Sequence, residues 1–145
     1  MDNRAVPVVV EELFNKPIET VWSALTERDQ MVLWFFTSIP DFKAEAGFST
    51  SFVIESGGRR FDHLWNIVEA EAPSKITYHW SYTGIPGAGT VLFELFEQSD
   101  GTLLRITNKG LESFPEDIPE FRRESCVAGW EYFIKGNLKH YLEPN

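Results

Sequence analysis

The side chains best suited to acid–base, nucleophilic or metal chemistry are few in this sequence of 145 residues. They are three histidines and one cysteine: His63, His79, His140 and Cys126. A zinc site needs nitrogen, sulfur or oxygen ligands that converge on one point. Strand alternation is expected to turn His79 away from the face that carries His63, and His140 lies near the last residue. We therefore predict no metal site, no cofactor and no catalytic residue within a complete motif.

His63 and Cys126 remain as single candidates for chemistry. A histidine titrates near pH 6.5 and can act as a general base if a substrate reaches it, but a core or pocket-rim histidine is the favoured interpretation. A reactive thiol needs a nearby cation or a helix N-terminus. Arg122 and Arg123 precede Cys126 closely in the sequence. A buried, inert cysteine is nevertheless the interpretation that we favour.

Composition and charge exclude several classes of function. The sequence holds 13 Lys and Arg against 22 Asp and Glu, a formal net charge of -9. Such a surface repels phosphate backbones and anionic lipid, so we expect neither a nucleic-acid partner nor membrane binding. One cysteine permits no intramolecular disulfide, and we find no signal-peptide pattern and no apolar run of membrane-spanning length. We predict a soluble, cytoplasmic protein in which residues 1–145 form one domain.

Most of the chain shows the period-two alternation of β-strands. Gly57-Gly58 predicts a two-residue hairpin turn, and Asp100-Gly101 predicts another turn. The glycine-rich stretch from Gly84 to Gly89 is expected to be a mobile hairpin loop, at the lip of any cavity. Successive antiparallel strands, arranged as a meander after the first, are predicted at residues 6–14, 48–55, 59–70, 75–82, 91–98 and 102–109.

Helical spacing predicts two short helices after the first strand and one long helix at the end. Pro17 is expected to open the first helix, because its fixed φ fits a first turn. Thr26 and Asp29 resemble a capping box that starts the second. Asp117 and Glu120 are expected to cap a final helix of about 22 residues, ~33 Å long, with an apolar stripe. The acidic residues around this cap are interpreted as solvated surface: Glu112, Glu116, Asp117 and Glu120.

Aromatic residues make up 14% of the sequence, and alternation gathers many of them on one face of the predicted sheet. The last helix, through Trp130 and Phe133, is the long apolar segment that can cover this face. Ring-lined pockets with a few polar groups are typical small-molecule sites, whereas a filled core is the alternative for any single residue. The candidate ligand-binding residues are Trp34, His63, Trp65, Tyr78, Trp80, Phe93, Asn108, Cys126, Trp130 and Phe133.

Several local patterns, in order along the chain, resemble the START-like or SRPBCC superfamily, and within it the bacterial proteins related to the C-terminal domain of the activator of Hsp90 ATPase. The patterns are Pro17–Thr26 with Trp34 following, Ile67–Trp80, Thr90–Leu95, Gly101–Asn108, Gly129-Trp130 and Leu138–Leu142. The resemblance implies an α+β helix-grip fold. In this fold a curved antiparallel sheet wraps around a long C-terminal helix, two short helices follow the first strand, and a ligand cavity lies between sheet and helix.

The resemblance leaves three kinds of function open, because one fold hosts many activities. The first is binding of a hydrophobic or aromatic small molecule, with His63 and Asn108 orienting a polar group. The second is a co-chaperone-like or other interaction module, with a homodimer or a protein partner. The third is a cyclase- or hydrolase-type enzyme in the same cavity. Relatives often carry histidine where this sequence has Asn108, which lowers the expectation of acid–base chemistry there.

Overall fold

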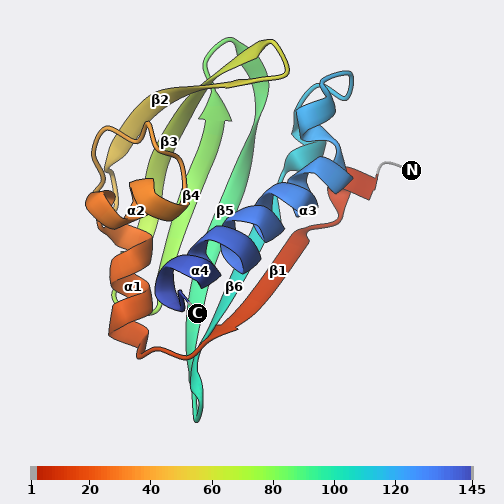
Figure 1. Cartoon of the computed structure of the whole chain (residues 1–145). Coiled ribbons are helices and arrows are strands. Elements are labelled where there is room, and N and C mark those ends of the chain that lie inside the picture. The colour runs from red at the N-terminus through yellow and green to blue at the C-terminus, as the bar shows by residue number, and fades with distance from the viewer. Residues whose placement is uncertain (1–2, 145) are drawn as a thin grey trace.

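Six antiparallel strands form one curved sheet in the computed structural model, which describes residues 3–144 (Figure 1). The strand order is β1-β6-β5-β4-β3-β2, so β2 to β6 form a meander and β1 pairs with β6 as an edge strand. This confirms the predicted sheet. The strands are β1 (Val8–Phe14), β2 (Ser49–Ser56), β3 (Arg59–Glu71), β4 (Lys75–Tyr82), β5 (Ile85–Gln98) and β6 (Gly101–Lys109).

The hairpin between β2 and β3 forms as its sequence predicts. Ser56 pairs with Arg59, which leaves Gly57 and Gly58 as the two turn residues. Their φ angles are +56° and +81°. Residues with a side chain rarely adopt positive φ, but a two-residue hairpin turn of this kind requires it at both positions. The turn between β5 and β6 lies one residue earlier than predicted, because Gln98 pairs with Gly101.

The stretch from Gly84 to Gly89 is not the loop that we expected. Strand β5 already begins at Ile85, which pairs with Tyr82, so the turn is short. A Cβ added at Gly87 would lie 2.5 Å from the carbonyl oxygen of Ser113. The glycines therefore let the strand pack closely against a 3-10 turn, η2 (Leu111–Ser113), rather than giving the chain freedom to move.

Two short helices, α1 (Ile18–Thr26) and α2 (Arg28–Trp34), follow β1 as predicted. The predicted capping box is wrong. Thr26 is still part of α1, and its hydroxyl donates to the carbonyl oxygen of Trp22 at 2.8 Å. Glu27 is the residue that precedes α2, and no side chain caps that helix.

The long C-terminal helix crosses the inner face of the sheet (Figure 1). It consists of α3 (Arg123–Glu131), the π-helical segment η4 (Tyr132–Leu138) and α4 (Lys139–Leu142). It starts later than expected, because the extended backbone of Arg122 separates it from a 3-10 turn, η3 (Pro119–Phe121). No helix within residues 3–144 combines the length and apolar character needed to cross a bilayer.

The core lies between the sheet, the two short helices and the C-terminal helix. Alternation along β3 holds as predicted, since Phe61, His63, Trp65 and Ile67 are all buried. The amide of Asn137 donates to the carbonyl oxygen of Trp34 at 3.1 Å and links the C-terminal helix to α2. The arrangement is the α+β helix-grip fold that the resemblance implies.

Candidate functional site

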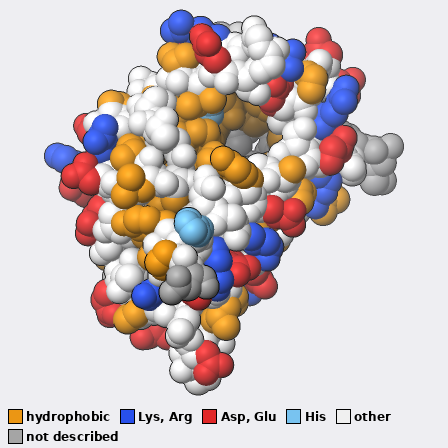
Figure 2. Space-filling model, viewed as in Figure 1, with side chains coloured by type: hydrophobic (Ala, Val, Ile, Leu, Met, Phe, Trp, Pro, Cys, Tyr) orange, Lys and Arg blue, Asp and Glu red, His pale blue; other side chains and the backbone are white. Residues whose placement is uncertain are grey.

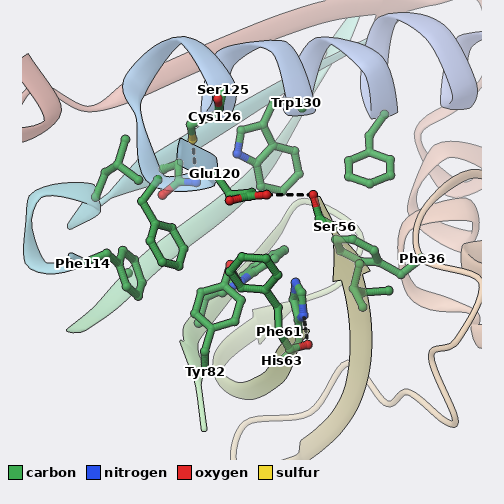
Figure 3. A pocket seen from close by; sticks show the side chains of 18 residues that line it. Phe36, Ser56, Phe61, His63, Tyr82, Phe114, Glu120, Ser125, Cys126 and Trp130 are labelled. Atoms are coloured by element: carbon green, nitrogen blue, oxygen red, sulfur yellow. Dashed lines mark hydrogen bonds between the residues drawn. The ribbon is translucent and has the colours of Figure 1, made fainter. Parts of the chain in front are cut away.

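A cavity of about 310 Å³ opens between the inner face of the sheet and the first half of the C-terminal helix. Figure 2 shows a hollow in this face of the molecule, with hydrophobic side chains on its border. Figure 3 shows the 18 residues that line the cavity, most of which are aromatic or aliphatic. The C-terminal helix crosses the curved sheet (Figure 1), and the cavity lies between residues of these two elements.

Helix α3 and the start of η4 supply one wall. Cys126, Gly129, Trp130 and Phe133 line the cavity. Their spacing of i, i+3, i+4 and i+7 places them on one helix face. Gly129 contributes no side chain to this wall, and a Cβ at this position would meet nothing within 4 Å.

The sheet supplies the opposite wall. Phe61 and His63 come from β3, Trp80 and Tyr82 from β4, and Asn108 from β6. Each pair on a strand is separated by two positions, so both members face inward. The wall follows directly from the alternation that the sequence shows.

The segment that precedes α3 closes one end of the cavity. Leu111, Phe114 and Phe121 form a small buried cluster with Phe61 of β3. The rings of Phe114 and Phe121 stack with centroids 4.6 Å apart. This cluster anchors the turn η3, so the chain reaches the helix only at Arg123.

His63 is the buried polar group of the inner wall, with 5% of its surface exposed. Its Nδ1 lies 3.1 Å from the carbonyl oxygen of Phe61 (Figure 3). Burial lowers the pKa of His63 to about 4, although the Phe61 carbonyl and the charge of Asp62 act in the opposite direction. The imidazole is therefore neutral at physiological pH.

Four further polar side chains of the cavity, those of Trp80, Tyr82, Asn108 and Cys126, are also uncharged and hydrogen-bonded. Trp80 Nε1 donates to the hydroxyl oxygen of Tyr82 at 2.8 Å, and Asn108 Nδ2 donates to Cys126 Sγ at 3.4 Å. Burial raises the pKa of Cys126 to about 11 and also raises the pKa of Tyr82. Both groups stay protonated at neutral pH, so the thiol is a poor nucleophile.

Glu120 brings the cavity its negative charge. Arg59 donates to both carboxylate oxygens, Nε to Oε1 at 2.8 Å and Nη2 to Oε2 at 3.0 Å. Ser56 Oγ donates to Oε2 at 2.9 Å (Figure 3). The Arg59 hydrogen bonds lower the pKa of Glu120 below its ordinary 4.5. Together Arg59, Glu120 and Ser56 form a bridge between the β2–β3 hairpin and η3.

Six of the ten ligand-binding residues predicted from the sequence line this cavity: His63, Trp80, Asn108, Cys126, Trp130 and Phe133. The other four lie in the packed core and do not line it: Trp34, Trp65, Tyr78 and Phe93. His79 and His140 are both exposed, and the exposure of His79 agrees with the alternation predicted for its strand. Within residues 3–144, no three His, Cys, Asp or Glu side chains gather as a metal ion would require.

Phe35 packs against three of the four core residues, Trp34, Trp65 and Phe93, and helps to separate them from the cavity. Its ring stacks on Trp34 at 4.6 Å and on Trp65 at 5.4 Å. It also contacts Phe133 at 4.9 Å and Phe93 at 6.4 Å. One ring at the end of α2 thus fills the space beneath the middle of the C-terminal helix.

Sequence reasoning missed several lining residues. Phe36 follows directly on Phe35, and Tyr82 lies two positions beyond Trp80 on the same face, a signal that alternation already contained. The sequence pattern assigns Glu120 to a helix cap on the solvated surface and Phe121 to the apolar stripe of the last helix, whereas both line the cavity. The apolar residues spaced through that acidic segment could have indicated that it packs against the sheet.

Solved structures share this fold over nearly the whole chain. Protein MLL2253 from Mesorhizobium loti is 26% identical, with a TM-score of 0.71, over 96% of this chain and 98% of its own. The Aha1 dimer from Colwellia psychrerythraea is 17% identical, with a TM-score of 0.72, over 95% and 96%. DynU16, from the dynemicin biosynthetic locus, is 24% identical, with a TM-score of 0.70, over 94% of this chain and 47% of its own. The curated proteins include no significant match.

A protein-family model also matches the sequence of this chain. The model for Activator of Hsp90 ATPase homolog 1-like protein matches residues 15–143. That span contains both short helices, strands β2 to β6, and the helix that covers them, and so includes every residue that lines the cavity. The chain therefore belongs to the Activator of Hsp90 ATPase homolog 1-like family.

Proposed function

We propose that this protein binds a hydrophobic or aromatic small molecule between its sheet and its C-terminal helix. The observation that carries the proposal is the ring-lined cavity of about 310 Å³. Small-molecule sites are apolar hollows of roughly this size or larger, with a few convergent polar groups. An enclosed set of rings that merely stabilised the fold would be expected to fill its own space.

Each wall has a part in the proposed binding. Trp80, Trp130 and Phe133 supply apolar contact area, and His63 and Asn108 orient a polar group of the ligand. Cys126 contributes a protonated thiol to the helix wall. The four predicted residues in the core hold these rings in place from behind: Trp34, Trp65, Tyr78 and Phe93.

Filling the cavity tests this function directly. Gly129 lines the cavity, and the side chain of Gly129→Leu has open space to occupy. Gly136 is a matched control, because it is an exposed glycine of the same helix at which a Cβ also meets nothing within 4 Å. Leucine is a good helix former, so neither substitution should unfold the helix.

The measurement is titration with N-phenyl-1-naphthylamine, an uncharged probe that fluoresces in apolar sites. We expect saturable binding of one probe per chain, loss of that binding in Gly129→Leu, and wild-type binding in Gly136→Leu. Absence of saturable binding to the wild-type protein, or equal binding by both variants, would refute the proposal.

Native mass spectrometry separates this function from the alternatives. A protein purified without added ligand is expected to carry a mass that disappears on denaturation, as a captured ligand would. A ligand-free homodimer would instead favour an interaction module, and the Aha1 protein from Colwellia psychrerythraea was solved as a dimer. The enzyme alternative depends on His63, whose low basicity makes it a weak general base.

We also propose that the protein is cytoplasmic, and cell fractionation tests this location.

A further inference from the structure

His63 presents an unpaired hydrogen-bond acceptor inside the cavity. A carbonyl oxygen can only accept, so the contact of 3.1 Å with Phe61 requires that Nδ1 carries the proton. The other ring nitrogen, Nε2, then keeps its lone pair in the neutral imidazole. No described residue donates to it, and the edge of the ring that bears it faces the cavity (Figure 3).

Neighbouring rings hold the imidazole in this orientation. Phe52 stacks on it with centroids 4.9 Å apart and planes at 14°. Tyr82 meets it edge-on at 4.8 Å, and Phe36 lies at 5.0 Å. The acceptor is therefore held in place before a ligand arrives, which reduces the entropic cost of recognition.

Tyr82 adds a hydrogen-bond donor beside this acceptor. Its oxygen accepts from Trp80 Nε1 at 2.8 Å, and its own proton has no acceptor among the described residues. Tyr82 and His63 both line the cavity, with adjoining rings. A hydroxyl group on a ligand is the simplest group that can donate to the histidine and accept from the tyrosine.

The cavity offers no counter-charge to an anion. Of its 18 lining residues, Glu120 is the one that is charged at neutral pH, and its charge is negative. A carboxylate ligand would lose its hydration without gaining a cationic partner, which is costly. The overall charge of -9 also repels anions.

We propose that the ligand is an uncharged alcohol or phenol on an aromatic or alicyclic skeleton, and that its hydroxyl donates to Nε2 of His63. This inference rests on the ligand-binding function proposed above. It replaces a general preference for apolar molecules with a chemical class, and it excludes fatty acids and other carboxylates as the preferred ligands.

Three probes with the same naphthalene skeleton test the class. They are 2-naphthol, which has a hydroxyl donor, 2-methoxynaphthalene, which has none, and 2-naphthoate, which is an anion. Each displaces N-phenyl-1-naphthylamine from the wild-type protein at neutral pH. We expect 2-naphthol to bind about tenfold more tightly than 2-methoxynaphthalene, because one buried hydrogen bond is gained. We expect 2-naphthoate to bind most weakly.

Substitutions at His63 assign the preference to the imidazole. His63→Phe keeps a ring of similar size between its neighbours and should reduce the advantage of 2-naphthol to within about twofold. His63→Gln retains an acceptor and should restore part of it. His79→Phe, on the exposed face of β4, should leave the wild-type preference intact.

The outcomes separate the two proposals. If N-phenyl-1-naphthylamine does not bind at all, the proposed function fails, and this inference fails with it. If it binds but 2-naphthoate competes as well as 2-naphthol, the function stands and the ligand class is wrong. The class is equally refuted if 2-naphthol has no advantage over 2-methoxynaphthalene, or if its advantage persists in His63→Phe.

Discussion

Arg59 and Glu120, 61 residues apart in the chain, form a two-point ion pair that joins the β2–β3 hairpin to the turn before the C-terminal helix. Ser56, at the end of β2, donates to the same carboxylate at 2.9 Å. Ser56 and Glu120 both line the cavity, so the bridge between them spans part of its border (Figure 3). The residues that close the cavity on this side thus belong to two segments that this bridge holds together.

Breaking this bridge should speed ligand exchange. In Arg59→Ala, the hairpin and η3 lose their main polar link, so the cavity opens more often. We expect both association and dissociation rates of N-phenyl-1-naphthylamine to rise about threefold or more, with little change in affinity. Stopped-flow fluorescence measures both rates.

Arg60→Ala is the control for the bridge. Arg60 lies next to Arg59 on the same strand, but its guanidinium pairs with Asp62 at 2.8 Å and connects no second segment. The exchange rates of Arg60→Ala should match those of the wild type.

The bridge also predicts a pH dependence. In the wild type, ligand exchange should accelerate only when the pH falls below 4.5 and Glu120 is protonated at its lowered pKa. Unchanged rates in Arg59→Ala would show that the bridge does not control access.

The buried His63 should make stability depend on pH between about 4 and 6.5. Burial lowers its pKa from 6.5 to about 4, so within this window the unfolded chain binds the proton and the folded chain does not. Stability therefore rises with pH across the window and is lost as the pH falls through it. The full effect is about 3 kcal/mol.

Urea unfolding of the wild type and of His63→Phe at several pH values measures this contribution. Near pH 7, the free energy of unfolding of His63→Phe should be only slightly lower than that of the wild type. As the pH falls toward 4, the variant should become more stable relative to the wild type. Taking the difference between the two proteins cancels the titration of surface carboxylates. His79→Gln should follow the wild-type curve. A difference that does not vary with pH would mean that His63 is accessible to protons in the folded state.

The order of the elements could be predicted from the sequence, because side-chain alternation reports directly which residues face the core. It worked for β3, where Phe61, His63 and Trp65 are all buried. It failed around Gly87, since glycines carry no side chain for alternation to show. There the neighbouring strands and the η2 turn determine the conformation, and these contacts are distant in sequence.

The position of the cavity along the sheet could not be predicted in the same way. His63 and Trp65 lie on one face of one strand, two positions apart, yet only His63 lines the cavity. The difference is made by Phe35, which stacks on Trp65 at 5.4 Å and comes from another part of the chain. Periodicity identifies a face, whereas the unfilled part of that face depends on which side chains from other elements reach it.

Two tyrosines on β4 should respond oppositely to loss of their hydroxyl groups. The hydroxyl of Tyr78 is buried and has no hydrogen-bond partner among the described residues, whereas that of Tyr82 accepts from Trp80 Nε1 at 2.8 Å. Tyr78→Phe should leave the free energy of unfolding unchanged or raise it. Tyr82→Phe should lower it by about 1 kcal/mol, because a buried indole donor loses its acceptor.

Both substitutions keep the aromatic ring, so each serves as the control for the other in urea unfolding. A loss of more than about 1 kcal/mol in Tyr78→Phe would contradict the prediction, because it would mean that the hydroxyl is bonded in solution, for example to a buried water molecule.

Cys126 should be chemically silent in the folded protein. Burial raises the pKa of its thiol to about 11, and the opposing effect of Arg123 is smaller. We expect the native protein at pH 8 to react with a disulfide reagent such as dithionitrobenzoate far more slowly than the same protein in urea, where its single thiol should react fully. Because Cys126 lines the cavity, bound 2-naphthol should slow the native reaction further. Rapid stoichiometric labelling of the native protein, unaffected by ligand, would place the thiol outside the cavity wall and would reopen a nucleophilic role for it.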